Sequence, residues 1–278
     1  MEFSEKVLVL RVGTFREADC WVRFFSPTHG LLTAFAFGGR RSRKRFCGCL
    51  DQLSLVHFRV SQGRQEYLCL QEGTLINGFG ELKRDLKKLG MVSNCVRFFE
   101  SLPFTPDGYA PAHQLLLETL EALDEERPGS WFIPLMFRAK MAFSQGYQPD
   151  LQRCRQCGGP LDAHHRAVFA VQEGGLYCLR CPSGGGAKIS TSRETLSLLF
   201  RLARSGPKEW ADWVPSARVR EECVHLVDAF VQCHLGLTCE GNQSAHSLGP
   251  EQARRKSRPR VSREVEIFAP PPDGQRRQ

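Results

Sequence analysis

The chain has 278 residues, of which 41% are apolar and 10% aromatic; this is enough to bury a core and excludes wholesale disorder. Its 38 basic and 30 acidic residues give a formal net charge of +8, which favours a polyanionic partner. No run approaches the roughly 18 apolar residues of a membrane span, and the first residues, MEFSEKVLVLRVG, lack the pattern of a secretory signal. We therefore expect a cytoplasmic protein that does not bind a membrane.

The first 80 residues predict a small barrel or sandwich of five strands. Short apolar runs alternate with turn signals such as READ, PTHG and SQG, a pattern typical of all-β domains. The runs are Lys6–Phe15, Cys20–Phe25, Leu31–Phe37, Leu53–Val60 and Tyr67–Ile76.

The periodicity changes to that of helices near Gly80. Glu81–Leu89 places Leu82, Leu86 and Leu89 on one helical face, with basic residues on the opposite face. Helical patterns continue over 91–102, 112–123, 131–146, 192–203 and 216–235, and we expect four prolines to separate the early helices. These prolines are Pro103, Pro106, Pro111 and Pro128.

Four of the twelve cysteines form two CxxC pairs separated by twenty residues. They are Cys154 and Cys157 in CRQC, and Cys178 and Cys181 in CLRC. Two such pairs complete the tetrahedral sulfur shell that Zn²⁺ prefers and leave no open coordination position. The alternatives are buried thiols, a redox pair, or ligation by His164 and His165, which lie between the pairs. The spacing predicts one structural Zn²⁺ per chain.

The stretch FGGRRSRKRFCG contains five basic residues within six positions and no acidic residue. They are Arg40, Arg41, Arg43, Lys44 and Arg45. Such a cluster favours phosphate counter-anions, although a solvated charged loop is the alternative. Phe46, Trp21 and Phe37 offer aromatic faces on which unpaired bases can stack. We therefore predict that this run contacts nucleic acid.

A second basic set follows the strand-rich region and is either an extension of the same surface or the solvated face of a helix. It comprises Lys83, Arg84, Lys87 and Lys88. Catalytic signals are missing: GxSxG and HExxH do not occur, and SGGGAKIS lacks the GxxxxGK[ST] of a phosphate loop. Cys47 and Cys49, with Cys20 or Cys69, are a weaker metal candidate than the quartet. We expect a protein that is not an enzyme.

The order of these features resembles the RecO recombination-mediator family of bacterial DNA repair, over residues 5 to 237. The N-terminal resemblance lies in VLVLRVGTFREADCWVRFFSPTHGLLTAFAFGGRRSR. The C-terminal resemblance lies in GYQPDLQRCRQCGGPL, FAVQEGGLYCLRC and the closing CHLGL. The joint order of these stretches, rather than any single one, is specific to the family.

The resemblance implies an N-terminal OB-fold and a helical domain with an inserted zinc element. It also implies binding of single- and double-stranded DNA and annealing of complementary strands. The implied partners are RecR and single-stranded-DNA-binding protein, through which RecA is loaded in RecF-type repair, with the protein at the nucleoid during repair. The competing interpretation is a zinc-ribbon protein that binds RNA or acts in transcription.

Residues and resemblance together predict an α+β protein of several domains. Residues 1–80 form the OB-fold, 81–150 and 190–237 form two parts of an all-α domain, and 151–189 form the zinc-binding insert. Residues 238–278 are expected to be a basic, disordered tail, in which Arg254–Arg263 holds six basic residues in ten.

Overall fold

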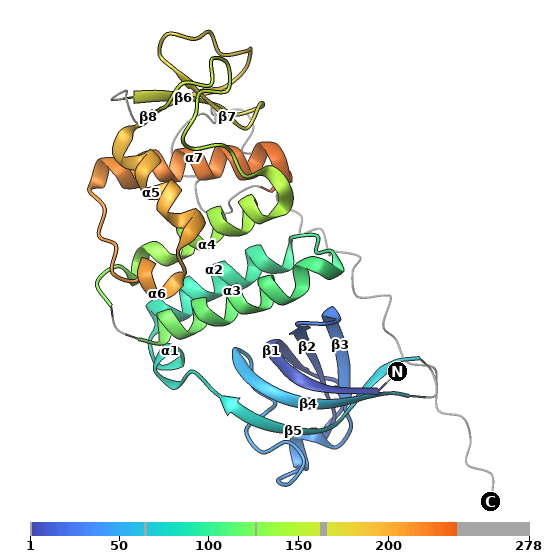
Figure 1. Ribbon diagram of the computed structural model, residues 1–278. Helices are drawn as coiled ribbons and strands as arrows, with labels where there is room; N and C mark the ends of the chain where they lie inside the picture. The colour runs from blue at the N-terminus through green and yellow to red at the C-terminus, as the bar shows by residue number, and fades with distance from the viewer. Residues whose placement is uncertain (1, 64–65, 126, 162–165, 238–278) are drawn as a thin grey trace, which may run out of the picture. The chain divides into compact units, whose positions relative to one another are not determined.

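The computed structural model describes residues 2–63, 66–125, 127–161 and 166–237 (Figure 1). The chain divides into two compact units, Met1–Thr238 and Cys239–Gln278, and every described residue belongs to the first. The predicted tail 238–278, with Arg254–Arg263, lies outside the described residues, as do His164 and His165. Among the helices described, none is both long enough and apolar enough to cross a bilayer.

The five predicted strands are all present, and they close into a barrel with the order β1-β2-β3-β5-β4. They are β1 (Glu2–Thr14), β2 (Cys20–Ser26), β3 (Gly30–Ala36), β4 (Ser54–Gln62) and β5 (Leu68–Asn77). Neighbouring strands are antiparallel except β3 and β5, which pair in parallel through Ala34–Leu68 and Phe35–Cys69. This short parallel pairing of β3 with β5 closes the barrel.

Strand alternation sorts the side chains of the barrel. Val7 and Val9 of β1 point into the barrel core, where they meet Phe24 and Phe58, all fully buried. The intervening Leu8 and Leu10 are also buried, but they belong to the core of the helical region. The uninterrupted apolar run VLVL thus corresponds to a strand with a core on each face.

The helical region packs directly against this strand. Phe25 of β2 meets the Phe99 ring edge-on, with the ring centroids 4.7 Å apart. The Glu100 carboxylate accepts from Arg11 at 2.5 Å and lies 3.2 Å from Arg23, so two barrel arginines contact one helix end. Apolar packing and ion pairing therefore both join the barrel to the helices.

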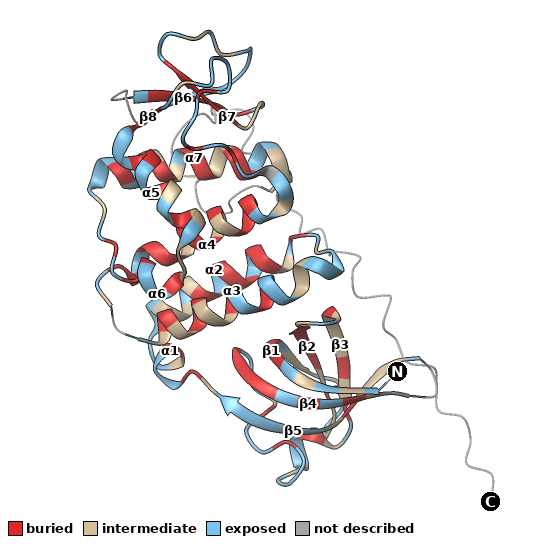
Figure 2. Ribbon diagram, in the orientation of Figure 1, coloured by how far each residue is buried: buried red, intermediate tan, exposed pale blue. Residues whose placement is uncertain are grey.

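Seven α-helices lie within the described ranges. They are α1 (Gly80–Arg84), α2 (Leu86–Glu100), α3 (Pro106–Asp124), α4 (Ile133–Ala142), α5 (Arg193–Arg204), α6 (Pro207–Trp210) and α7 (Ala217–Leu235), accompanied by the short helices η1 (Gly39–Arg41), η2 (Ser130–Phe132) and η3 (Phe143–Tyr147). The hydroxyls of Ser192 and Ser216 cap α5 and α7 by accepting from Thr195 and Val219 N–H groups. Buried residues lie where the helices face one another (Figure 2).

Two helix predictions are wrong. The expected helix Glu81–Leu89 is broken at Asp85, whose backbone is extended (φ −105°, ψ 116°) and whose carboxylate accepts from the Lys87 N–H at 2.7 Å. Asp85 is thus the N-cap of α2, and Leu86, in its first turn, is 84% exposed instead of sharing a buried face with Leu82. Pro111 does not separate helices, since α3 continues through it with one backbone donor missing.

The cysteine-bearing insert forms a small antiparallel sheet with the order β7-β6-β8. Its strands are β6 (Arg166–Ala170), β7 (Gly175–Cys178) and β8 (Lys188–Ser192). Phe169 of β6 lies in the same core as Phe230 of α7, with ring centroids 6.1 Å apart. The sheet is therefore anchored on the helical region, with Cys178 at the end of β7, Cys181 just after it, and Cys154 and Cys157 in the segment before β6.

Candidate metal centre and nucleic-acid interface

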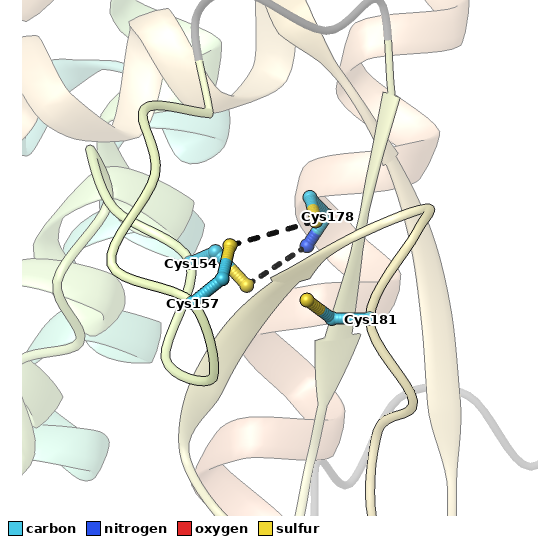
Figure 3. Close-up of side chains that lie close together, drawn as sticks. All are labelled: Cys154, Cys157, Cys178 and Cys181. Atoms are coloured by element: carbon cyan, nitrogen blue, oxygen red, sulfur yellow. Dashed lines mark hydrogen bonds between the residues drawn. The ribbon is translucent and has the colours of Figure 1, made fainter.

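The four predicted ligands converge. The Sγ atoms of Cys154, Cys157, Cys178 and Cys181 all lie within 4.8 Å of one another. They approach from two separate turns (Figure 3). The Cys157 and Cys178 sulfurs are 4.0 Å apart, and four Zn–S bonds of about 2.3 Å would place tetrahedral sulfurs about 3.8 Å apart. The quartet therefore fits a tetrahedral metal with sub-ångström adjustment.

Backbone hydrogen bonds hold both turns in shape. The Cys154 N–H donates to the Gly159 carbonyl at 2.8 Å, and the Gly158 N–H donates back to the Cys154 carbonyl at 2.9 Å. Gly158 has φ +68°, a conformation that a residue with a Cβ adopts only with strain. The second turn closes through the Cys181 N–H, which donates to the Cys178 carbonyl at 3.1 Å.

The sulfurs differ in acidity. Burial raises the pKa of Cys154, but backbone N–H groups of Cys157 and Cys178 point at its sulfur and lower the pKa to about 6. One of these contacts is the Cys178 N–H at 3.3 Å. Hydrogen bonding to the Cys178 and Cys157 sulfurs raises the pKa of Cys181 to about 12. The Cys154 thiolate is therefore favoured at neutral pH, whereas the Cys181 thiol stays protonated unless a divalent cation displaces its proton.

The centre is buried on one side only. Cys154 is 2% and Cys178 3% exposed, within the helical-region core, whereas Cys157 is exposed and Cys181 half-buried. Within the described ranges, no other group of three or more Cys, His, Asp or Glu side chains converges with this geometry. In particular, Cys47 and Cys49 do not gather with Cys20 or Cys69 into such a group.

The basic run lies on the segment that crosses from β3 to β4 and includes η1. Its two ends are fastened to the barrel. The Gly38 N–H donates to the Asp19 carboxylate at 2.7 Å and the Arg40 N–H to the Ala18 carbonyl at 3.1 Å. At the other end, the Arg45 carbonyl accepts from the Gly73 N–H of β5 at 2.8 Å. The arginines are thus presented from an ordered backbone.

All five basic side chains of this run are exposed. Arg41 reaches Glu17 at 3.2 Å, and Arg45 donates to the Phe37 carbonyl at 2.7 Å. Arg40, Arg43 and Lys44 form no ion pair with any carboxylate in the part of the chain that the structure describes. Cations without partners, side by side, are the arrangement expected of a phosphate-binding surface.

A groove of about 590 Å³ runs beside these cations. Arg40 and Arg43 line it together with Gly13 and Thr14, at the end of β1. Asp51 is also in the lining, where its carboxylate accepts from Lys83 at 2.7 Å. Two basic side chains of the run and the end of a barrel strand therefore share one groove.

One expected stacking face is wrong. Phe46 is only 3% exposed and belongs to the barrel core, with the Arg45 guanidinium 5.1 Å from its ring centroid. Phe37 is 39% exposed, as a stacking face requires, and Trp21 is half-buried against Gly13. Three further aromatic residues were not predicted: Phe35 and Tyr67 contact Phe37, and Phe15 contacts Phe35. The alternation in TAFAF could have indicated this cluster, because Phe35 and Phe37 alternate with two alanines that are buried.

The second basic set has partners within the protein. Lys83, 22% exposed, donates to Asp51 and to the Ser54 hydroxyl at 2.9 Å. Lys88 donates to the Asp124 carbonyl at 2.9 Å, at the C-terminal end of α3. Arg84 pairs with Glu81 at 2.5 Å, and Lys87 is exposed. DNA contact by these four residues stays a prediction. In the structure, Lys83 and Lys88 also have internal partners that hold neighbouring segments together.

Comparison with known proteins covers nearly all of the described chain. Residues 1–79 match the family model described as Recombination protein O N terminal, and residues 83–240 match Recombination protein O C terminal. The first match ends just before α1 and the second begins within α1, where the barrel gives way to helices. The cysteine quartet lies inside the C-terminal match.

Relatives matched over nearly their full length indicate the same family. DNA repair protein RecO of Nitratidesulfovibrio vulgaris is 46% identical over 244 residues, covering 86% of this chain and 97% of that protein. The protein of the same name from Maridesulfovibrio salexigens is 42% identical over 243 residues, covering 87% and 98%. That of Lawsonia intracellularis is 35% identical over 242 residues, covering 86% and 96%. The predicted resemblance is confirmed, and the chain belongs to the RecO family of DNA repair proteins.

Proposed function

We propose that this protein is a recombination mediator that binds single- and double-stranded DNA and anneals complementary strands. In this role it works in RecF-type repair with RecR and single-stranded-DNA-binding protein, and it helps to load RecA onto coated DNA. Family membership supports the repair role. The observation that carries DNA binding is the ordered row of cations without ion-pair partners, Arg40, Arg43 and Lys44, beside a groove on the barrel.

The proposed mechanism requires no bond-making chemistry by the protein. Two strands anneal only if their phosphate repulsion is screened while the base edges remain free to pair. Arginine and lysine side chains contact phosphates without reading sequence, so they screen charge and leave pairing to the bases. The closed barrel, with strand order β1-β2-β3-β5-β4, supports use of the N-terminal region as an OB-fold that tracks a nucleic-acid backbone.

We further propose that the cysteine quartet holds one structural Zn²⁺. A bound divalent metal would cross-link the two cysteine turns, and four thiolates would leave it no position for a substrate. The protein's own contribution is to anchor this element on the helical region, since Cys154 and Cys178 already lie in that core. Zinc on this proposal secures the architecture and takes no part in DNA chemistry.

A strand-annealing assay tests the function. Two complementary labelled oligonucleotides are mixed with and without the protein, bare or coated with single-stranded-DNA-binding protein. We expect faster annealing in both cases. No acceleration, together with no DNA binding, would contradict the proposal. Tighter binding to a structured RNA competitor would favour the RNA-binding interpretation instead, and cleavage or joining of labelled DNA in Mg²⁺ would contradict a non-enzymatic role.

A further inference from the structure

Four aromatic rings gather on the outside of the barrel, at a place where three segments meet. They are Phe15 in the β1–β2 turn, Phe35 in β3, Phe37 just after β3, and Tyr67 just before β5. The ring centroids of Phe15 and Phe35 are 5.4 Å apart, and those of Phe35 and Phe37 are 6.1 Å apart with the planes 20° from parallel. Tyr67 lies 5.8 Å from Phe35 and 6.0 Å from Phe37.

The rings face away from the barrel interior. Ala34 and Ala36, on either side of Phe35, are both fully buried, so strand geometry turns Phe35 outward, and Phe37, just after the strand, stacks with it. The parallel pairing of β3 with β5 brings Tyr67 alongside them. Phe37 is 39% exposed and the other three rings are half-buried. A cluster of aromatic faces on the outside of a barrel marks a binding surface.

Cations flank the rings on two sides. The Arg16 guanidinium lies 5.3 Å from the Phe15 centroid, and Arg45 donates to the Phe37 carbonyl. Arg41 pairs with Glu17, which follows Phe15 and Arg16 in the same turn, so the basic run and the aromatic cluster share one rim. Aromatic faces bordered by positive charge match a single-stranded polynucleotide, which offers free base faces and phosphates together.

We propose that Phe15, Phe35, Phe37 and Tyr67 form a base-stacking platform that makes the barrel select unpaired over duplex DNA. This inference rests on the proposed function, because it concerns which form of DNA the same surface takes. In a duplex the bases are stacked on each other, so a duplex engages the cations and leaves the rings uncovered. A single strand engages both, and the difference in affinity between the two forms originates in the rings.

The test uses the full-length protein and three probes of equal length: oligothymidylate, an abasic deoxyribose-phosphate strand, and a blunt duplex. The variant carries Phe37→Leu and Tyr67→Leu, which keep apolar bulk but remove the two rings. Because stacking on the two rings is lost, we expect roughly tenfold weaker binding of oligothymidylate. Binding of the abasic strand and of the duplex should change less than about twofold.

Matched variants separate the platform from general effects. Trp131→Leu removes a 42%-exposed aromatic side chain from η2, outside the barrel, and should leave all three affinities unchanged. Phe37→Trp with Tyr67→Phe retains two aromatic faces and should restore preference for oligothymidylate. Replacement of Arg43 and Lys44 by glutamine should weaken all three probes together, since phosphates are common to them.

The outcomes distinguish the two levels of the proposal. Equal loss on oligothymidylate and on the abasic strand, or no loss at all, overturns the platform while leaving DNA binding in place. If the wild-type protein binds none of the three probes, the proposed function itself fails. Should the leucine variant not fold, the wild-type protein is titrated with oligonucleotides carrying 2-aminopurine. Quenching on binding supports stacking, and unchanged fluorescence in the bound state overturns it.

Discussion

Replacing Arg40, Arg43 and Lys44 by glutamine tests whether the unpartnered cations hold phosphates. If all five basic residues of the run contact a single strand, the log–log dependence of affinity on salt has a slope of about −3.5, at roughly 0.7 per phosphate. Removing three contacts leaves a slope of about −1.4. A fourfold rise in salt then weakens wild-type binding about 130-fold and variant binding about sevenfold. Fluorescence anisotropy of a labelled oligonucleotide over a salt series measures both slopes.

The structure supplies the choice of residues and the control. Arg41 and Arg45 are left in place because they already contact Glu17 and the Phe37 carbonyl. Arg59, on β4, is a control cation of the same barrel, which pairs with Glu2 and Glu72 at 3.3 Å. Arg59→Gln should leave the slope within experimental error. A folded triple variant whose slope equals that of the wild type would refute the assignment of phosphate contact to this run.

Three further predictions concern stability and the metal. Elemental analysis should find one zinc per chain, and Cys154→Ser should lower both the zinc content and the melting temperature. The DNA affinity of the variant, measured below its melting temperature, should stay within about twofold of the wild-type value. A metal-free wild-type preparation of equal stability would contradict this prediction. Burial raises the pKa of Glu222, but hydrogen bonds from Ser192 and Thr195 lower it from 4.5 to about 2. The resulting stabilisation, about 3 kcal/mol, is complete above its ordinary pKa of 4.5 and is lost as pH falls towards 2. Denaturant unfolding should show Glu222→Gln less stable at pH 7 and equal to wild type near pH 2, and a pH-independent difference would count against the charge. Asp85→Ala removes the N-cap of α2 and should cost about 1 kcal/mol in the same measurement, with Asp85→Asn as the capping-competent control.

The strands were predictable because each barrel strand carries its own local pattern. Alternation and turn residues identify all five, but they carry no information on which strands are neighbours. The parallel contact of β3 with β5 and the return of β4 to β1 are long-range pairings that local patterns do not encode. The two-sided burial of β1 is visible in hindsight as VLVL, a run without polar interruption.

In the candidate sites, too, local sequence patterns were predictive and long-range contacts were not. The cysteine quartet was predictable because ligand spacing reflects metal geometry directly, and the four sulfurs do converge. Phe46 was misassigned because exposure depends on whether a loop residue turns inward, which neighbouring charges do not reveal. Likewise, Lys83 and Lys88 resemble other surface lysines in sequence, and only the folded chain brings Asp51 and the end of α3 to them.

Strand β1 has a consequence for dissecting the protein into parts. Although the two matched regions are separated by only the first residues of α1, Leu8 and Leu10 of β1 and Phe25 of β2 are buried in the core that the helical region forms. A fragment comprising only residues 1–79 would expose these side chains as an apolar surface patch that favours aggregation. The two halves are therefore modular in sequence yet interdependent in folding, and a melting experiment on residues 1–237 should record one transition rather than two.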